Sequence, residues 1–215
     1  MRYYVESDGR VFLVPREGLL DLPTKDELPF DVEEIASLAP RAGVLFAVPR
    51  LDRHPEAWPS KDDLVASACV TPLVREAIHA GMPRVVVEAL CIDRERILLV
   101  RGSRGFTKGR WSLPGGFLRF GETPKNGLRR ELREELRVEA HVTGEGDVRA
   151  KLGAGSRLHW IMIFYRADLR GDPSPDPDEI VEARLVPFDE ACGLLFDDVM
   201  REVVLQMMQR GREYV

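Results

Sequence analysis

The strongest constraint on the fold of this 215-residue chain is a charged segment, residues 122–139, whose leucines recur at helical spacing. Thr123 is a suitable N-cap and Pro124 suits the first helical position, so a helix is expected to begin there and to run to about Arg137. One narrow apolar stripe along this helix would face a core, and it consists of Leu128, Leu132 and Leu136. The segment therefore predicts an amphipathic helix that packs on one side against a hydrophobic core.

Three glutamates lie on an arc of this helix beside the leucine stripe: Glu131, Glu134 and Glu135. Glu131 and Glu135 are one turn apart, and two like charges at roughly 6 Å in an effective dielectric near ~20 cost about 3 kcal/mol. Such a cluster is expected to bind a cation, and carboxylate oxygens without cysteine or histidine suit Mg²⁺ or Mn²⁺. The alternative is that the five basic residues of the segment pair with the glutamates in ordinary i,i+4 ion pairs, without a metal.

A glycine-rich turn precedes the helix. Residues 111–113 are expected to form a short strand, which Pro114, Gly115 and Gly116 end with a tight turn. Because glycine lets the backbone approach a ligand closely, a carbonyl at Gly115 or Gly116 can also face the cation. For Gly115 a second interpretation is open, in which the glycine only permits a positive φ.

The spacing of these residues resembles the signature of the Nudix hydrolase family. The chain reads G-x5-E-x7-R-E-L-x-E-E-x-R-V from Gly116 to Val138, and the family signature is G-x5-E-x7-R-E-U-x-E-E-x-G-U, where U is a bulky aliphatic residue. The departure is Arg137 in place of the late glycine. Because arginine adopts a left-handed conformation less readily than glycine, the exit turn of the helix is expected to differ, with the activity retained.

The resemblance implies an α/β/α sandwich with a mixed sheet over about residues 84–200, and metal-assisted cleavage of a diphosphate bond. It implies four ligands for Mg²⁺ or Mn²⁺, which are Gly116, Glu131, Glu134 and Glu135. A structural role in supporting the loop is expected for Glu122 and Arg130.

In the mechanism that the resemblance implies, the metal lowers the pKa of a bound water and a glutamate takes the proton from that water. Glu134 is the first candidate for this base. Glu179, in an acidic loop, is the second, with a solvated turn as its alternative role. Glu131 is a further catalytic candidate.

A basic stretch before the helix is expected to hold phosphate groups. From Asp93 to Arg119 there are seven basic residues against two acidic ones. Arginine donates bidentate hydrogen bonds to phosphate. Arg101 and Arg110 are the favoured substrate-binding side chains, together with Gly115, because Arg101 ends a strand and Arg110 enters the Pro-Gly-Gly turn. The alternative for each arginine is a role in solubility alone.

The resemblance also implies a small phosphoanhydride substrate, and a nucleoside triphosphate or a nucleoside diphosphate derivative is the default expectation. ADP-ribose hydrolases of the family tend to carry a proline after the motif, whereas this chain has none between Glu139 and Gly171. Four aromatic residues are candidates for stacking on a base, with the core as the alternative place for each: Phe106, Trp111, Phe120 and Trp160.

Composition and charge exclude several classes of protein. The net charge of −5 argues against bulk affinity for duplex nucleic acid or for an anionic membrane, and no apolar run approaches the ~20 residues that span a bilayer. Three widely spaced cysteines without a CxxC pair argue against a disulfide framework and a zinc ribbon. A cytoplasmic enzyme in a reducing compartment is therefore expected.

The chain is expected to divide near residue 82 into an N-terminal α+β extension of unknown role, residues 1–82, and a Nudix domain, residues 83–215. In related enzymes such an N-terminal region often forms a dimer interface or covers the substrate, which makes a homodimer a candidate state.

Apolar patterns and turn residues predict the elements of both parts. In the extension we expect a hairpin around Asp8-Gly9, helices at 31–38 and 72–80, and a strand at 44–48. In the second part, strands at 85–90 and 97–101 are expected to form a hairpin. The later elements are expected to be strands at 140–150, 157–169 and 180–187 and a helix at 197–209.

Two other uses of the Nudix fold are alternatives. Non-catalytic nucleotide sensors usually lose glutamates of the motif, and this chain retains all of them. Prenyl diphosphate isomerases need a positioned cysteine and glutamate, and Cys91 lacks the flanking motifs of those enzymes. The metal-dependent hydrolase is therefore the favoured interpretation, with the sensor as the alternative.

Overall fold

The structure, a computed structural model of the chain, describes residues 1–39, 43–53, 55–153 and 158–212. It divides into two compact units, each described by itself below. The N-terminal unit comprises Met1–Pro83 with Leu152–His159, and the C-terminal unit comprises Arg84–Lys151 with Trp160–Val215. No helix within the described ranges is both long and apolar enough to span a membrane.

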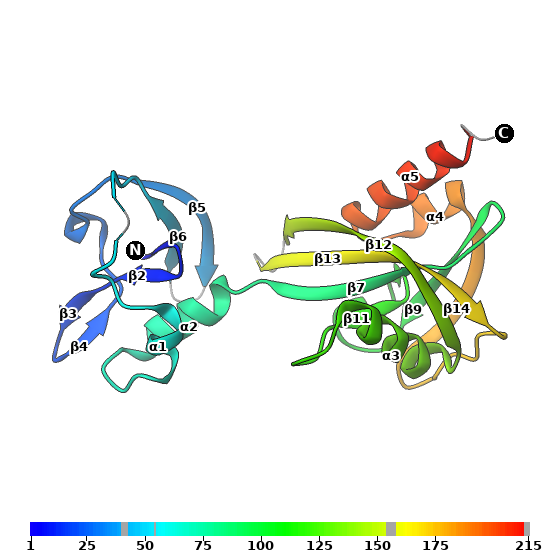
Figure 1. The fold of residues 1–215 in the computed structure, drawn as a ribbon, viewed down its shortest axis with the longest axis horizontal. Helices are drawn as coiled ribbons and strands as arrows, with labels where there is room; N and C mark the ends of the chain where they lie inside the picture. Colours follow the sequence, from blue (N-terminus) through cyan, green and yellow to red (C-terminus); the bar gives the residue numbers. More distant parts are fainter. Residues whose placement is uncertain (40–42, 54, 154–157, 213–215) are drawn as a thin grey trace. The chain divides into compact units, whose positions relative to one another are not determined.

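The N-terminal unit is built on a four-stranded sheet with the strand order β2-β1-β6-β5 (Figure 1). Its strands are β1 (Arg2–Ser7), β2 (Arg10–Phe12), β5 (Val32–Ala39) and β6 (Val44–Pro49). The unit also contains the two-stranded sheet of β3 (Val14–Arg16) and β4 (Leu19–Asp21), the 3-10 turn η1 (Lys25–Glu27), and helices α1 (Lys61–Ala66) and α2 (Pro72–Gly81). Side chains of the sheet and of both helices share one buried cluster that includes Tyr4, Leu64 and Ile78.

The hairpin expected around Asp8-Gly9 is confirmed as β1 and β2, which pair antiparallel. Asp8 and Gly9 have φ angles of 49° and 72°, and a two-residue turn with both φ positive matches the right-handed twist of the strands. The strand expected at 44–48 and the helix expected at 72–80 are confirmed as β6 and α2.

The helix expected at residues 31–38 is wrong, because this segment forms the edge strand β5. It pairs antiparallel with β6, with Glu33 opposite Val48. Glutamate and alanine favour a helix by intrinsic propensity, but the ladder with β6 and a 2.7 Å hydrogen bond from the Tyr3 hydroxyl to Glu34 favour the strand. Contacts remote in the sequence thus override the local preference.

The C-terminal unit is an α/β/α sandwich, as expected from the sequence. Its strands form two sheets of order β10-β9-β14 and β11-β7-β13-β12, and β8 pairs with β9. The strands are β7 (Arg84–Leu90), β8 (Ile92–Asp93), β9 (Arg96–Gly102), β10 (Trp111–Ser112), β11 (Gly115–Phe117), β12 (Glu139–Leu152), β13 (His159–Arg170) and β14 (Ile180–Pro187). The helices are α3 (Pro124–Leu136), α4 (Phe188–Leu194) and α5 (Asp198–Arg212), and the 3-10 turn η2 covers Gly105–Thr107.

Alternate residues of the central strands face opposite helical layers. On β7, Val87 and Ala89 belong to the buried cluster that contains the leucines of α3. Val86 and Leu90 belong to a second cluster, which contains side chains of α4 and α5. Because successive side chains of a strand point to opposite faces, the strands form a middle layer with α3 on one side and α5 on the other (Figure 1).

The expected pairing of strand 85–90 with strand 97–101 in a hairpin is wrong. The turn at Arg94 and Glu95 joins β9 to the short strand β8, with Asp93 opposite Arg96. Strand β7 pairs instead with β11 and β13. The chain changes sheet after Leu90, which places β7 beside the glycine-rich strand that precedes α3.

Helix α3 ends without the change in its exit turn that Arg137 was expected to cause. Arg137 adopts the left-handed conformation, with φ 52° and ψ 34°, and its backbone N–H donates to the Arg133 carbonyl at 3.0 Å. Its guanidinium lies 3.0 Å from the Asp176 carboxylate. The expected change is therefore wrong, because Arg137 takes the left-handed conformation that glycine would adopt at lower cost. Its ion pair links it to the loop between β13 and β14.

The loop between β13 and β14 caps the C-terminus of α3. The backbone N–H of Ser174 donates to the Leu136 carbonyl at 2.8 Å, and that of Asp176 donates to the Glu135 carbonyl at 2.8 Å. These bonds satisfy carbonyls that a helix end leaves without intrahelical partners. They also hold the loop that carries Glu179 next to the last turn of α3.

Candidate active site

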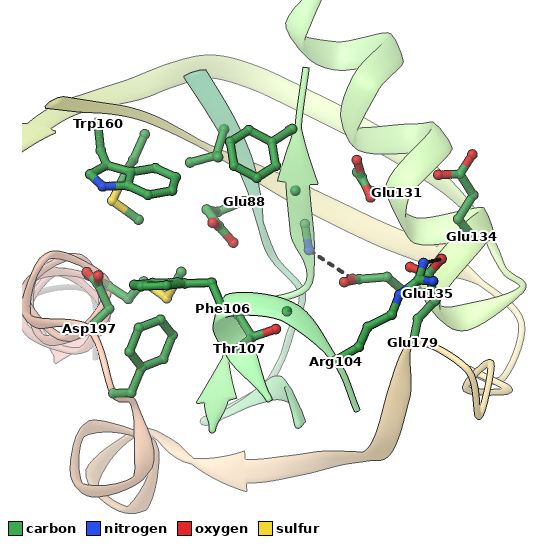
Figure 2. A pocket seen from close by; sticks show the side chains of 18 of the residues that line it. Glu88, Arg104, Phe106, Thr107, Glu131, Glu134, Glu135, Trp160, Glu179 and Asp197 are labelled. Carbon is green, nitrogen blue, oxygen red and sulfur yellow. Dashed lines mark hydrogen bonds and ion pairs between the residues drawn. The ribbon is translucent and has the colours of Figure 1, made fainter. Parts of the chain in front are cut away.

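A pocket of about 450 Å³ opens in the C-terminal unit where α3, β7, β11 and the η2 turn meet (Figure 2). Six carboxylates reach its wall from four segments: Glu88, Glu131, Glu134, Glu135, Glu179 and Asp197. The wall also contains the backbone of Gly115 and Gly116 and a group of aromatic side chains. The pocket therefore joins the motif of the sequence to residues far from it in the chain.

Gly115 and Gly116 pack directly against the glutamates of α3. The backbone N–H of Gly115 donates to Oε2 of Glu135 at 3.0 Å. A Cβ on Gly116 would lie 2.7 Å from Cδ of Glu131, so a side chain there would displace that carboxylate. Gly115 has φ 150°, and a Cβ there would overlap the Val87 carbonyl oxygen. Glycine is thus required sterically at position 115, where β11 lies against β7, and glycine at position 116 leaves room for the Glu131 carboxylate.

Burial makes the ionised forms of Glu131 and Glu135 unfavourable. Burial raises the pKa of Glu131, and the neighbouring Glu134 and Glu179 carboxylates add to this rise against the effect of Arg130. Burial also raises the pKa of Glu135 well above its ordinary value, with the Gly115 N–H as the main opposing influence. Partly buried carboxylates of this kind are stabilised when a cation binds next to them.

Arg130 joins the loop before α3 to the glutamates on the helix. Its guanidinium donates to Glu122, Glu131 and Glu134 at 2.7–2.9 Å and to the Phe117 carbonyl at 2.9 Å. The hydrogen bonds from Arg130 and from the Arg119 N–H lower the pKa of Glu122 to about 2. Arg130 lines the pocket and Glu122 does not, and the structural role expected for this pair stays a prediction.

Glu134 and Glu179, the two candidates for the base, each pair with an exposed arginine. Glu134 accepts from Arg119 at 2.9 Å, and Glu179 accepts from Arg104 at 2.5 Å. Both arginines line the pocket together with Arg130 and Lys151. The sequence reasoning missed Arg104 and Arg119, because a run of seven basic residues gives no sign of which ones turn inward.

The structure places neither of the two arginines favoured from the sequence on the pocket wall. Arg101 lies 3.0 Å from Glu182 and its guanidinium covers the Trp111 ring. Arg110 lies over the rings of Phe106 and Phe196, at 5.6 and 5.5 Å from their centroids. Ion pairing across the β9–β14 ladder and contact with aromatic rings occupy both side chains.

Aromatic side chains form the opposite end of the pocket. The rings of Phe106 and Trp160 are stacked with centroids 5.8 Å apart, and Phe196 and Phe117 contact this pair edge-on or tilted. Phe106 is 57% exposed, so part of this aromatic group is accessible to a ligand. Of the other stacking candidates, Trp111 does not line the pocket and Phe120 is fully exposed outside it.

Three further charged residues of the pocket were not found from the sequence: Glu88, Lys151 and Asp197. Lys151 and Asp197 form an ion pair, and Asp197 is 5% exposed. Glu88 is also 5% exposed and stands alone among apolar residues of β7. A single glutamate inside the run Val-Val-Val-Glu-Ala-Leu was the signal that could have identified it.

The oxygen donors of the site suit a hard cation, but their side chains are not arranged around a single point in this structure. No group of three acidic, histidine or cysteine side chains in the described part of the chain is arranged to hold a metal. Arg130 and Arg119 occupy the oxygens of Glu131 and Glu134. The oxygen-only donor set and the buried carboxylates next to a glycine backbone suit Mg²⁺ or Mn²⁺ once such ion pairs open.

Comparison with known proteins gives one consistent family. The family model described as NUDIX domain matches residues 82–206. An ADP-ribose pyrophosphatase of Methanocaldococcus jannaschii is 30% identical over 115 residues, which cover 54% of this chain and 68% of that protein. The oxidized purine nucleoside triphosphate hydrolase of Mus musculus is 30% identical over 92 residues, 42% of this chain and 59% of that protein.

Solved structures show the same fold. The MutT NUDIX hydrolase of Burkholderia pseudomallei has a TM-score of 0.51 and 27% identity, and the match covers 58% of this chain and 98% of that one. A NUDIX hydrolase of Nitrosomonas europaea has a TM-score of 0.53 and 21% identity over 85% of this chain and 88% of that one. The second likeness extends beyond residues 82–206 and concerns the fold alone.

Proposed function

The chain belongs to the Nudix family of pyrophosphohydrolases, and we propose that it hydrolyses a phosphoanhydride bond of a nucleotide with the help of Mg²⁺ or Mn²⁺. The observation that carries this proposal is the contact between the glycine backbone of β11 and the glutamates of α3. It brings Gly115, Gly116, Glu131 and Glu135 to the wall of one pocket.

The residues that would hold the cation are those of the motif: the Gly116 carbonyl and the carboxylates of Glu131, Glu134 and Glu135. When bound, such a cation neutralises phosphate oxygens and lowers the pKa of a coordinated water. The raised pKa values of Glu131 and Glu135 support this assignment, because both carboxylates gain from a nearby positive charge.

Glu134 is the residue that we propose as the proton acceptor, with Glu179 as the second candidate. Water attack on phosphorus needs a carboxylate oxygen that is ionised and accessible from the pocket. The Glu134 side chain lines the pocket and is 37% exposed, next to Arg119 and Arg130. Glu179 lines the pocket from the loop that caps α3, and its carboxylate adds to the raised pKa of Glu131 and Glu135. Figure 2 shows it beside Arg104 and Glu135.

Arg104 and Arg119 are proposed to bind the phosphate groups of the substrate. Their side chains are 68% and 63% exposed, and each holds a carboxylate that lies on the pocket wall. An incoming phosphate offers oxygens of the same charge, so each guanidinium can exchange a carboxylate for a phosphate. That exchange would also release Glu134 and Glu179.

The substrate is proposed to be a nucleotide, because an aromatic end lies opposite the acidic end of the pocket. A base stacked on Phe106 or Trp160 would extend its phosphates toward α3. The names of the relatives support the class, since they act on ADP-ribose or on nucleoside triphosphates. A cytoplasmic location and a homodimer remain predictions from the sequence.

The test is turnover of a panel of nucleoside triphosphates, dinucleoside polyphosphates, ADP-ribose and NADH, with Mg²⁺ or Mn²⁺ and with EDTA. We expect metal-dependent release of nucleotide products from at least one compound and none with EDTA. Binding of these nucleotides without turnover of any of them, by folded and metal-loaded protein, would contradict the proposal and favour a nucleotide sensor.

A further inference from the structure

Glu88 is a buried carboxylate that the motif does not explain. Its Oε2 atom is buried and has no hydrogen-bond partner among the residues that the structure describes. Buried polar groups in folded proteins are almost always hydrogen-bonded, since an unpaired one is costly. Glu88 lines the pocket, so the missing partner can come from a molecule that enters it.

The strand direction separates Glu88 from the glutamates of α3. Side chains alternate along β7, and Val87 and Ala89 pack on the α3 side. Glu88 therefore points to the other face, the face on which Val86 and Leu90 contact side chains of α4 and α5. Figure 2 shows the Glu88 carboxylate on the side of Trp160, apart from Glu131.

The surroundings of Glu88 are both polar and aromatic. Burial and the Glu135 and Glu131 carboxylates raise the pKa of Glu88 well above its ordinary value, and Lys151, which pairs with Asp197, opposes this rise. The aromatic residues Phe106 and Trp160 lie on the same side of the pocket. Gly115 lies opposite Glu88 in the β7–β11 ladder, and as a glycine it places no side chain against the Glu88 carboxylate. A ligand with its phosphates at α3 and its base on the aromatic rings would pass over Glu88.

We propose that Glu88 hydrogen-bonds the nucleoside part of the substrate, with Lys151 beside it as a second polar group. The partner on the nucleoside is a sugar hydroxyl or an amino group of the base. Each of these groups can donate a hydrogen bond to a carboxylate. A hydroxyl both donates and accepts, so it can pair with Glu88 and with the Lys151 ammonium. This inference rests on the proposed function, because it assumes a nucleotide in this pocket.

A competing role for Glu88 is that of an additional metal ligand. One observation argues against it: Glu88 lies on the sheet face opposite α3, which carries the proposed ligands. The two roles make opposite predictions for metal affinity, which allows one set of variants to separate them.

The experiment compares wild type with Glu88→Leu, Glu88→Gln and a matched control, Glu182→Gln. Glu182 pairs with Arg101 outside the pocket wall, so the control removes an acidic charge without touching the site. Mn²⁺ affinity is measured from the electron paramagnetic resonance of free Mn²⁺, without nucleotide. Values of kcat and KM are measured for ATP, 2′-deoxy-ATP, GTP, ITP and ADP-ribose, and thermal melting checks folding.

The expected result for Glu88→Leu is a loss of about 10- to 100-fold in kcat/KM on the best nucleotide, mainly through KM, with Mn²⁺ affinity unchanged. Glu88→Gln keeps the shape of the side chain and is expected to lose less. Loss of a wild-type preference for ATP over 2′-deoxy-ATP would identify a sugar hydroxyl as the partner. Loss of a preference for GTP over ITP would identify the base amino group.

Two results would overturn the inference: weaker Mn²⁺ binding by both Glu88 variants, or an unchanged kcat/KM on every nucleotide in a folded variant. If wild type turns over no nucleotide, the proposed function fails separately. Calorimetric binding of ATP and ADP-ribose then decides the role of Glu88. Binding by wild type that Glu88→Leu loses would support the subsite, and equal binding or no binding would contradict it.

Discussion

Two carboxylates compete for the role of proton acceptor, and single substitutions can rank them. Glu134 lies on α3 between Arg119 and Arg130, whereas Glu179 lies on the loop before β14 next to Arg104. We predict that Glu134→Gln lowers kcat by about 10²- to 10⁴-fold with a smaller effect on KM, because removal of a general base acts on the chemical step. Steady-state kinetics on the best substrate measures this.

The control for that prediction is Glu139→Gln, which removes a carboxylate that pairs with Arg133 at 3.2 Å outside the pocket. It should leave kcat unchanged. A larger loss of kcat in Glu179→Gln than in Glu134→Gln would exchange the proposed roles of the two residues.

The Glu122–Arg130 pair is predicted to stabilise the folded protein, and this stabilisation is predicted to be lost at low pH. Arg130 lowers the pKa of Glu122 from 4.5 to about 2 in the folded protein. A lowered folded-state pKa means that the stabilisation is fully present above the unfolded value and is lost as the pH falls through the folded value. Glu122→Gln should therefore be less stable than wild type above about pH 5, with the difference shrinking toward about pH 2. Urea unfolding across this range measures it, and a difference independent of pH would contradict the assignment.

Helix α3 shows how the departure from the family signature is accommodated. Arg137 has φ 52°, a conformation that costs an L-residue with a Cβ about 1–2 kcal/mol relative to glycine. Arg137→Gly and Arg137→Ala both remove the ion pair to Asp176, and they differ only in the Cβ. We predict that the glycine variant is more stable than the alanine variant by about 1 kcal/mol. Equal midpoints in urea would show that the left-handed turn is not strained.

Local patterns predicted the elements whose own residues decide their structure. The leucine stripe of α3, the Asp8-Gly9 hairpin and the apolar run of β13 were recognised because each carries its signal within a few residues. Residues 31–38 were misassigned because the pairing of β5 with β6 is a contact between segments, and β7 was given the wrong partner for the same reason.

The residues of the candidate site also divide into those with a local signal in the sequence and those brought together by contacts between distant segments. The glutamates of α3 share a helix, and their spacing alone places them together. The inward position of Arg104 depends on the η2 turn, and Lys151 and Asp197 meet only because β12 and the start of α5 are adjacent in the fold. Arg101 was favoured because it ends a strand, but its partner Glu182 is on β14, a strand that the local sequence does not connect to it.

At the scale of the whole molecule, metal binding and stability should be linked through the buried carboxylates. Glu131 and Glu135 have raised folded-state pKa values, so their ionisation destabilises the fold as the pH rises above the unfolded value. A bound cation offsets this destabilisation. A free cation concentration of about 100 times the dissociation constant adds about 2.7 kcal/mol to the free energy of unfolding. Millimolar Mg²⁺ should therefore raise the Tm more at about pH 7 than at about pH 5. The same shift at both pH values, or an undiminished shift in Glu135→Gln, would argue against these ligands.

The most direct test of the account is hydrolysis of the best substrate in H₂¹⁸O with Mg²⁺, followed by mass spectrometry of the products. Attack of water on phosphorus predicts one ¹⁸O atom in a phosphate group of one product, with none in the sugar or base, and no turnover after removal of the metal by EDTA. Label in a non-phosphate fragment, or turnover that persists in EDTA, would contradict metal-assisted cleavage of a phosphoanhydride bond at this site.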